Sequence, residues 1–322
     1  MWKRCPIPIL GIGNDIPSGR SRSWYKIKRP IERGLVTDWN DMESIWQYSF
    51  NNLRVTVEEC VALLLESPTN PKVNREKMTQ IMFERFLVPA MLGVNNAVMS
   101  LFASGRTTGL VLSCGEDISH SVPIYEGHAL SQNTNNAQVG GRHLIEYLQR
   151  LLHEREDHIT RDEEQVRFIK EKYCKIALDF NSEEKEVKEY ELPDGTTIFM
   201  GEETFKSPEL LLQPNLNNMD SLGIREIIVK SIENSDPDIK RDLRENIILS
   251  GGSTLFPGMD DRLRNDLFQS FKQQARIIAP PERSFSAWIG GSILGSLGLH
   301  QHWICKEEYE DTGAAIIHRK CF

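Results

Sequence analysis

The most informative segment of this chain is Leu249-Ser250-Gly251-Gly252-Ser253-Thr254-Leu255-Phe256-Pro257-Gly258. Ile247 and Ile248 precede it, and an amphipathic segment that begins near Asp260 follows it. This order predicts a buried strand, a glycine loop and a helix. Two adjacent glycines lack Cβ atoms, so backbone N–H groups of the loop can approach a phosphate or a sugar, and the following helix N-terminus favours negative charge. A purely structural turn explains the loop equally well, because its spacing matches neither a P-loop nor a dinucleotide-binding fingerprint.

Further motifs accompany this loop in a fixed order. After it come residues 279–283 (Ala-Pro-Pro-Glu-Arg), residues 286–297, which contain Trp288-Ile289-Gly290-Gly291, and the final Ile317-His318-Arg319-Lys320-Cys321-Phe322. Before it come residues 29–34, 74–84, 103–109 and 169–172. Together these motifs resemble the actin family. The resemblance runs from about Arg29 to Phe322 and leaves residues 1–28 outside it.

The resemblance implies an α/β fold, the actin-like ATPase fold, in which two ribonuclease H-like lobes surround a nucleotide cleft. A length of 322 residues agrees with more than one lobe, because it exceeds what a single core usually supports. The expected domains are a divergent basic arm over 1–29, a first lobe over 30–103 plus 285–322, a second-lobe core over 104–139 plus 219–284, and an outer subdomain over 140–218. The fold is expected to be N-terminally truncated.

The composition favours protein partners over nucleic acid. The 46 acidic residues outnumber the 38 basic ones, which gives a formal net charge of -8 and argues against a basic footprint over the whole surface. Residues 1–29 carry seven Lys or Arg and one acid, Asp15, so they form either a loose terminus or a segment for an acidic partner. Scattered cysteines without a C-x-x-C pair predict free thiols. No apolar run approaches the roughly 18 residues of a membrane span, so a soluble, intracellular protein is expected. The resemblance implies the cytoplasm and the cytoskeleton, with the nucleus as an alternative.

Hydrophobic spacing and turn residues predict the local elements that would carry a site. In chain order these are a helix capped by Thr37 or Asp38, a strand over 61–66, helices over 74–86 and 97–103, a hairpin over 110–123 with its turn at 113–118, and a helix that begins at Gly141.

The resemblance implies a nucleotide with a divalent metal in the cleft, ATP or ADP with Mg²⁺, and an adenosine clamp that this chain keeps. Arg167, Lys170 and Glu171 match the family's nucleoside-contacting helix, and their spacing places Arg167 beside both others on one helical face. The opposite wall matches the family at Gly251, Gly252, Ser253, Thr254 and Leu255. Without the family context, the helix face would be interpreted as a solvated row of ion pairs.

The phosphate end departs from the family. The family's first phosphate loop, with a metal-facing aspartate and a phosphate-facing lysine, should precede Arg29, and nothing there resembles it. The second phosphate loop keeps only Gly115. Its other positions carry Ser113 for an aspartate, Cys114 for a serine, Glu116 for an aspartate and Asp117 for a glycine. Because Mg²⁺ relies on oxygen ligands such as the missing carboxylate, and because Asp117 adds negative charge near the phosphates, we predict no metal site.

For hydrolysis, the resemblance implies a water oriented by a glutamine and a histidine. His120 matches the histidine, whereas Asn96 stands at the glutamine position and is one methylene shorter. His120 is equally well explained as a buried strand histidine. The basic residue that flanks the adenine in the family is Ser284 here. Since each lost hydrogen bond to a charged group costs roughly 1.5–3 kcal/mol, the changes predict weak or absent ATP binding and no useful turnover.

The resemblance also implies a groove in which regulatory proteins insert an amphipathic helix. The matching residues are Phe102, Gly105, Thr107, Ile293, Leu294 and Leu297. Gly291, Gly295 and Gly298 have a spacing that lets a helix approach another backbone closely. Residues 215–220 replace a more apolar loop that packs across the family's filament, so conventional filaments are not expected.

Three hypotheses follow. The leading one is an actin-like cytoskeletal protein that acts mainly through protein–protein contacts, with weakened or lost ATP binding and hydrolysis, so an enzyme is the less favoured interpretation. The second is a nucleotide-binding actin-like ATPase switch or filament subunit. The third is a nuclear actin-related scaffold of a chromatin complex. A truncated gene product would also explain the missing first loop, but not the altered Ser113, Cys114 and Asp117.

Overall fold

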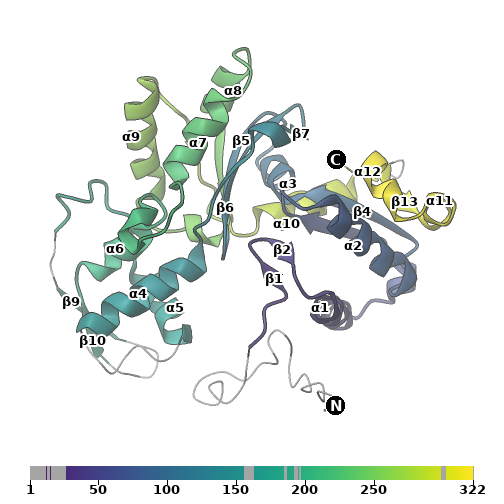
Figure 1. Ribbon diagram of the computed structural model, residues 1–322, viewed down its shortest axis with the longest axis horizontal. Helices are drawn as coiled ribbons and strands as arrows, with labels where there is room; N and C mark the ends of the chain where they lie inside the picture. Colours follow the sequence, from purple (N-terminus) through teal and green to yellow (C-terminus); the bar gives the residue numbers. More distant parts are fainter. Residues whose placement is uncertain are drawn as a thin grey trace.

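The fold is seen in a computed structural model of the chain (Figure 1). The structure describes residues 12, 15, 27–155, 163–184, 187–191, 195, 197–298 and 302–321. These residues form a six-stranded sheet, a three-stranded sheet and two two-stranded pairs, with helices between them. The predicted α/β class is therefore confirmed, whereas most of the predicted basic arm lies outside the described residues.

The three-stranded sheet has the order β13-β4-β3. Strands β3 (Ala62–Glu66) and β4 (Ala90–Asn95) are parallel, and β13 (Ile304–Cys305) runs antiparallel to β4. The same half holds α1 (Trp39–Leu53), α2 (Lys72–Glu84), α11 (Lys306–Thr312) and α12 (Ile317–Lys320) (Figure 1). Arg75 of α2 donates to Glu66 at 2.8 Å and to the carbonyl of Cys321 at 3.1 Å. The closing motif of the chain is thus tied to this sheet.

The six-stranded sheet carries the segments that were expected to bind a ligand. Its order is β12 (Ile277–Ile278), β11 (Ile247–Ser250), β5 (Gly109–Cys114), β6 (Ser119–Tyr125) and β7 (His128–Ala129), and β8 (Asn135–Ala137) also pairs with β6. Strand β11 is parallel to β5 and β12, and β5 is antiparallel to β6. The predicted hairpin over 110–123 is confirmed.

Helices cover both faces of this sheet. One face packs on the group α4 (Gly141–Arg155), α7 (Ile224–Glu233) and α9 (Met259–Phe271). The other face packs on α3 (Asn96–Ala103). Side chains alternate accordingly, because Leu110 and Leu112 lie in one buried cluster and Val111 lies in the other. The second cluster also contains Leu92 of β4, so α3 joins the two sheets through one continuous core.

Several local predictions hold closely. Asp38 caps α1, since its carboxylate accepts hydrogen bonds from the backbone N–H groups of Asn40 and Asp41. Helix α2 begins at Lys72, two residues before the predicted start. After β11, a short turn η6 (Gly252–Thr254) leads to α9, which begins one residue before Asp260.

Helix α10 (Ser286–Ser296) corrects the prediction about its glycines. A Cβ added at Gly290 would lie 1.9 Å from the backbone oxygen of Met99 on α3, whereas Gly295 has no heavy atom within 4 Å. A Cβ on Gly291 would meet only side chains, those of Leu63 and Leu65. Gly290 is therefore the residue that lets α10 and α3 cross closely, and the expectation that Gly291 and Gly295 do so was wrong.

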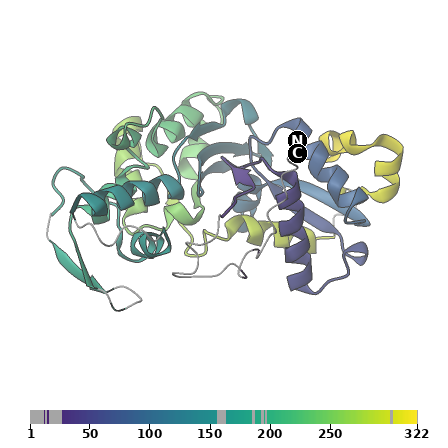
Figure 2. The same cartoon turned by 60° about the horizontal axis from the view of Figure 1, so that its bottom comes forward.

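The remaining elements are small. Strands β9 (Lys188–Glu191) and β10 (Thr197–Met200) form a hairpin that projects from the body (Figure 2). Strands β1 (Ile31–Glu32) and β2 (Leu35–Val36) form a second hairpin, which lies between the two halves (Figure 1). The other helices and turns are η3 (Val57–Glu59), η4 (Ser131–Asn133), α5 (Glu163–Tyr173), α6 (Glu203–Glu209), η5 (Pro214–Asn217), α8 (Lys240–Glu245) and η8 (Ala314–Ile316).

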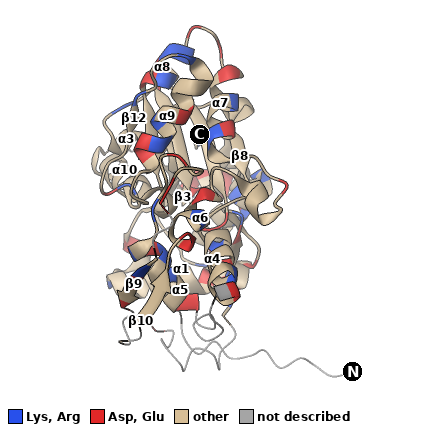
Figure 3. Cartoon of the chain, turned by 90° about the vertical axis from the view of Figure 1, so that its left-hand side faces the viewer, with Lys and Arg blue, Asp and Glu red and all other residues tan. Residues whose placement is uncertain are grey.

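Surface and thiol chemistry agree with the composition. Acidic and basic residues are interspersed along the helices on the side shown in Figure 3. The five cysteines that can be placed, Cys60, Cys114, Cys174, Cys305 and Cys321, are free thiols as predicted, and Cys5 lies outside the described residues. Among the helices whose residues are described, none has the length and apolar character needed to cross a bilayer.

Candidate functional site

A cavity of about 400 Å³ lies where the ends of β5 and β11 meet α5. Pockets of this size hold small molecules. Its lining consists of Gly115, Glu116, Lys170, Glu171, Gly252, Ser253, Leu255, Phe256 and Ser284. Six of the residues predicted to bind the cofactor are in that set, and they come from three distant segments. The structure thus brings the two expected walls together around one space.

The glycine loop is fixed by its backbone geometry. Gly251 adopts φ 89°, and a Cβ there would lie 2.3 Å from the carbonyl oxygen of Cys114. A residue with a side chain would be both strained and blocked at this position. The Ser253 hydroxyl then donates to the carbonyl of Gly115 at 2.9 Å. The loop after β11 and the turn after β5 are therefore locked against each other.

Two residues of this loop that were predicted to bind the cofactor, Gly251 and Thr254, do not line the cavity. Gly251 packs on the end of β5, as described, and Thr254 is fully buried. The Thr254 hydroxyl donates to the carbonyl of Gly251 at 2.7 Å and accepts from Nε of Arg283 at 3.1 Å. Both residues shape the loop rather than face the cavity.

Lys170 places a cation at the wall of the cavity. It is buried on α5, and its Nζ lies 3.5 Å from the carbonyl oxygen of Gly141. Burial lowers the pKa of Lys170, and the nearby carboxylates of Glu116 and Glu171 oppose that shift. A buried ammonium beside polar oxygens is suited to hold the hydroxyl groups or ring nitrogens of a nucleoside.

Arg167 is engaged by carboxylates instead of facing the cavity. Its Nη2 lies 2.9 Å from Oε1 of Glu116 and 3.6 Å from Oε1 of Glu163. The same Glu163 oxygen lies 2.5 Å from Nη2 of Arg29, near the start of the described chain. All four side chains are more than a third exposed to solvent. Each ion pair therefore contributes at most about 1 kcal/mol to the stability of the fold. Together they connect the segment around Arg29 to α5.

The turn between β5 and β6 is tight, and the carboxylate of Asp117 connects it to two other segments. The N–H of Gly115 donates to the carbonyl of Ile118 at 3.1 Å, which makes the turn tight. Oδ1 of Asp117 lies 2.8 Å from Nη2 of Arg142, and its Oδ2 accepts from the backbone N–H of Arg33 at 3.2 Å. A Cβ at Gly140 would lie 2.7 Å from the carbonyl oxygen of Glu116, so the start of α4 packs directly on this turn. Asp117 thus links three segments.

The neighbouring positions offer no strong ligand for a metal. Cys114 is fully buried, and burial raises the pKa of its thiol to about 12, so it stays protonated at neutral pH. Ser113 lies opposite His120 in the register of β5 and β6, and beside Ser250 in that of β5 and β11. Within the described residues, no three His, Cys, Asp or Glu side chains are grouped to hold a metal ion.

His120 is a buried residue of β6, and Asn96 is a partly buried residue at the start of α3. His120 is 5 % exposed, and burial lowers the pKa of its ring to about 4, so the ring is neutral at pH 7. Both ring nitrogens of His120, and Oδ1 of Asn96, are buried without a hydrogen-bond partner among the residues that the structure describes. The two side chains do not line the cavity of about 400 Å³.

A family model described as Actin matches residues 10–322. This covers nearly the whole chain. The chain belongs to the actin family. The match begins at residue 10, so the expectation that residues 1–28 lie outside the resemblance was wrong for residues 10–28. The weak motif content there explains the miss, since the quoted motifs all begin at residue 29 or later.

Sequence reasoning missed the partners of the altered actin-family turn. Arg142 and Arg33, which hold Asp117, were not singled out. Arg142 follows Gly141 at the start of a predicted helix, and a carboxylate in place of a glycine signals that a basic partner should exist. The contact with Arg33 uses its backbone N–H, so no pattern of side chains in the sequence predicts it.

The residues matching the actin-family groove lie on α3, on α10 and in the turn that follows α3. Phe102 and Leu294 are partly buried against the second core cluster, and Ile293 and Leu297 are 43 % and 62 % exposed. Gly105 has φ 71° and an open position for a Cβ. Since α3 and α10 pack directly on each other, these residues share one region of the surface.

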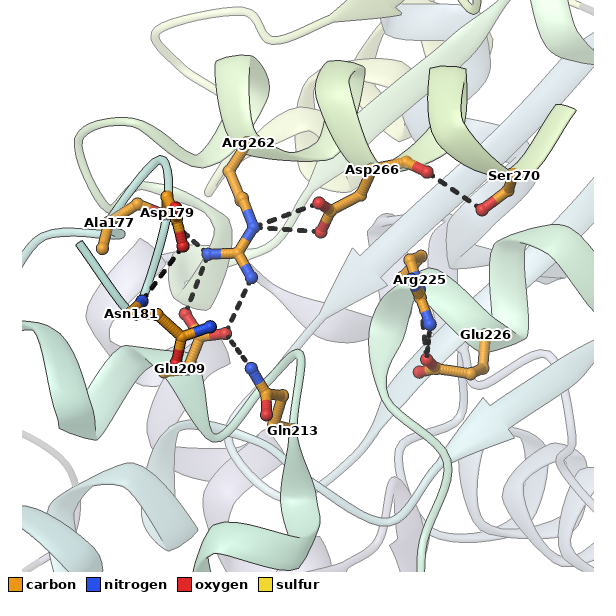
Figure 4. Close-up of polar contacts among 10 residues, drawn as sticks. All are labelled: Ala177, Asp179, Asn181, Glu209, Gln213, Arg225, Glu226, Arg262, Asp266 and Ser270. Atoms are coloured by element: carbon orange, nitrogen blue, oxygen red, sulfur yellow. Dashed lines mark hydrogen bonds and ion pairs between the residues drawn. The ribbon is translucent and has the colours of Figure 1, made fainter. Parts of the chain in front are cut away.

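A larger cavity of about 970 Å³ lies elsewhere, between α7, α9 and residues 212–223. Arg262 lines this cavity and pairs with the buried Glu209, with Nη2 to Oε1 at 2.8 Å and Nη1 to Oε2 at 3.1 Å (Figure 4). Nε of Arg262 also donates to Asp266, and Arg225 binds Glu226 at 2.7 Å. Both cations are already paired with carboxylates, so neither offers an unpaired positive charge to a ligand in this larger cavity.

Proposed function

We propose that this actin-family chain acts mainly through protein–protein contacts and binds Mg-ATP weakly or not at all. Its two sheet-bearing halves would correspond to the family's lobes, and the smaller cavity to the adenosine end of the cleft. The region of Phe102, Ile293 and Leu297 is the expected contact surface for cytoskeletal partners. The cytoplasm and the cytoskeleton are the expected location.

The observation that carries this proposal is the ion pair between Asp117 and Arg142. The Asp117 side chain is 11 % exposed, and it stands where the family has a glycine near the phosphates. An incoming phosphate would meet a fixed carboxylate there. Ser113 supplies no carboxylate for a metal, so these residues do not fit a Mg-triphosphate. Lys170, Glu171 and the glycine loop do fit an adenosine.

The expected loss of affinity follows from the number of contacts. A hydrogen bond that involves a charged group is worth roughly 1.5–3 kcal/mol, and about 1.4 kcal/mol corresponds to tenfold in affinity. Losing two or three such contacts, with some non-additivity, weakens Mg-ATP binding by about three orders of magnitude. Turnover would then be negligible at ordinary nucleotide concentrations.

Calorimetry of the wild type with Mg-ATP and with adenosine tests the proposal. The matched variant is Ser113→Asp combined with Asp117→Gly, which restores the family's residues at both positions. Mg-ATP should bind this variant at least tenfold more tightly than it binds the wild type, while adenosine binding should stay unchanged. Submicromolar affinity of the wild type for Mg-ATP would overturn the proposal.

The second candidate is a nucleotide-binding switch, and the intact cavity around Lys170 favours it. A switch of this kind would retain an adenine nucleotide through purification. Mass spectrometry of the native protein distinguishes the two candidates, because a stoichiometric nucleotide supports the switch and its absence supports the contact-only function.

A further inference from the structure

The larger cavity, of about 970 Å³, is lined by four segments of the chain. They are residues 178–179 after α5, residues 212–215 after α6, residues within 221–226 at the start of α7, and part of α9 between Arg262 and Gln269. All four segments lie within the part of the chain that the structure describes. Since ligand sites have volumes of roughly 300–1,000 Å³, this cavity has room for several linked side chains of a ligand.

Backbone contacts and a buried ion pair hold these segments together. A Cβ at Gly223 would lie 2.0 Å from the carbonyl oxygen of Leu212, so these two residues pack backbone against backbone. The guanidinium group of Arg262 donates to the carbonyl of Ala177 at 2.7 Å and to Glu209 of α6 at 2.8 Å. The cavity is therefore formed before a ligand binds, which lowers the cost of ordering on binding.

Carboxylates outnumber guanidinium groups at this cavity. Arg225 pairs with Glu226 at 2.7 Å (Figure 4). Arg262 binds two carboxylates, with Nε 3.0 Å from Oδ2 of Asp266 and Nη2 2.8 Å from Oε1 of Glu209. Because one guanidinium group is shared by two carboxylates, these pairs leave a net negative charge.

Asp179 adds a carboxylate that no cation neutralises. The residue is exposed, and its Oδ1 accepts from the backbone N–H of Asn181 at 3.0 Å. This hydrogen bond holds the pKa of Asp179 below its usual value, so the carboxylate is ionised at neutral pH. Among the described residues it forms no ion pair. A positively charged group on a ligand would complement the cavity.

Three large apolar side chains of the lining are exposed. Leu178 is 55 % exposed, Leu222 is 41 % exposed and Phe268 is 51 % exposed. They come from the segment after α5, from the start of α7 and from α9, so only the folded chain brings them to one cavity. Exposed apolar side chains that are grouped among polar ones are typical of an interaction site. A ligand of this cavity should therefore carry apolar groups beside its positive charge.

Three side-chain amides of the lining are available for hydrogen bonds. Asn215, Asn265 and Gln269 form no side-chain hydrogen bond with any residue that the structure describes. Each amide offers both donors and an acceptor, and an extended peptide backbone presents both kinds of partner. These amides favour a peptide over a metal ion or a lipid tail, neither of which could use their donors.

We propose that the larger cavity binds a short segment of a partner protein in which Arg or Lys is flanked by apolar residues. The cation of this segment lies near Asp179 and Asp266, and its apolar side chains pack on Leu178, Leu222 and Phe268. The free amides bond to its backbone. This inference goes beyond the proposed function, because neither the smaller cavity nor the surface of α3 and α10 lines this site.

Selection from a library of random peptides displayed on phage tests the chemistry of the partner. The library is selected on the immobilised wild-type chain and depleted on the Phe268→Ser chain, which lacks one apolar side chain of the cavity. The enriched peptides should share Arg or Lys next to Leu, Ile, Val or Phe. An acidic or wholly polar motif would overturn the inference, and so would the absence of any enriched motif.

Fluorescence polarisation with the most enriched peptide tests the site. Asp179→Asn and Phe268→Ser should each weaken binding at least tenfold, and added salt should weaken binding to the wild type because exposed charges are screened. The matched controls lie outside the lining: Asp261→Asn, at an exposed acid of α9, and Phe285→Ser, at a 65 % exposed position. Both controls should bind as the wild type does. Circular dichroism checks that all four variants are folded.

Unchanged affinity in Asp179→Asn or in Phe268→Ser would overturn the inference. An equal loss in the control variants would do the same, because the peptide would then bind elsewhere. The Ser113→Asp, Asp117→Gly variant should bind the peptide as tightly as the wild type, so this test fails independently of the nucleotide proposal.

Discussion

Buried polar side chains in this protein fall into two groups. Arg262 uses all three guanidinium nitrogens, which donate to Glu209, Asp266 and the carbonyl of Ala177. His120 has no partner for either ring nitrogen among the described residues. A buried polar group without a hydrogen bond costs about 1–3 kcal/mol. Arg262 therefore supports the fold, whereas the two unpartnered ring nitrogens of His120 carry a cost in stability.

The pKa of His120 predicts an acid-sensitive fold. In the folded state the pKa is about 4, and in the unfolded state it is near 6.5. The unfolded chain thus binds a proton first as pH falls, so stability is lost between pH 6.5 and 4, by about 3 kcal/mol in total. His120→Gln should remove most of this slope in urea unfolding between pH 7 and 5. His128→Gln on β7 is the matched control for removing a histidine, and an unchanged slope in His120→Gln would contradict the prediction.

The buried pair of Arg262 and Glu209 predicts that a single substitution lowers the unfolding free energy much more than replacement of both residues by apolar ones. Glu209 is 0 % exposed, so Glu209→Gln leaves a buried guanidinium underpaired and should cost about 3–5 kcal/mol of unfolding free energy. Arg262→Met with Glu209→Leu should recover at least half of that loss. Glu245→Gln, in the exposed pair with Arg241, should change stability by less than about 1 kcal/mol. Denaturant unfolding measures all three. Equal losses in the buried and the exposed pair would refute the asymmetry.

At the scale of elements, sequence reasoning succeeded where local chemistry sets the structure. The Asp38 cap, the β5–β6 hairpin and the strand–glycine loop–helix order follow from propensities and turn residues in one stretch of chain. The contact of Gly290 with Met99 could not be predicted in this way, because it depends on which face of α10 meets α3. Glycine spacing alone predicted Gly291, Gly295 and Gly298, whereas the packing against α3 selects Gly290.

Two of the three glycines of α10, Gly290 and Gly295, predict opposite effects of the same substitution. Gly290→Ala would place a methyl group 1.9 Å from a backbone oxygen, so α10 must shift, at a cost of about 1–3 kcal/mol or more. Gly295→Ala adds a methyl group in open space on a helix and should stabilise by about 0.5–1 kcal/mol. Thermal unfolding of the two variants provides the comparison, with each as the control of the other. A Gly290→Ala variant as stable as Gly295→Ala would show that α10 does not cross α3 at this residue.

At the scale of the whole molecule, the family was predictable and the long-range ties were not. The motifs identified the fold, and the structure then brought residues 115, 170 and 252 around one cavity. The contacts of Asp117 with Arg142 and with the backbone of Arg33 join positions far apart in the chain. No periodicity or motif encodes them, because they exist only once separate segments of the chain have packed together.

The contacts of Asp117 with Arg142 and with the backbone of Arg33 predict that Asp117 holds the β1–β2 hairpin between the halves. The hairpin also touches both sides, since a Cβ at Gly34 would lie 3.1 Å from Oγ of Ser67 and 3.8 Å from a methyl group of Ile118. Asp117→Ala removes the acceptor for the Arg33 N–H, a bond worth about 0.5–1.5 kcal/mol, which corresponds to roughly two- to tenfold faster local opening. Hydrogen exchange of peptides covering residues 27–38 should therefore accelerate by that factor, while peptides from β3 and β4 stay as in the wild type. Glu310→Ala, at an exposed acid on α11, should leave both sets unchanged. Unaltered exchange of residues 27–38 in Asp117→Ala would mean that the hairpin is held by Ser67 and by the Arg29–Glu163 pair alone.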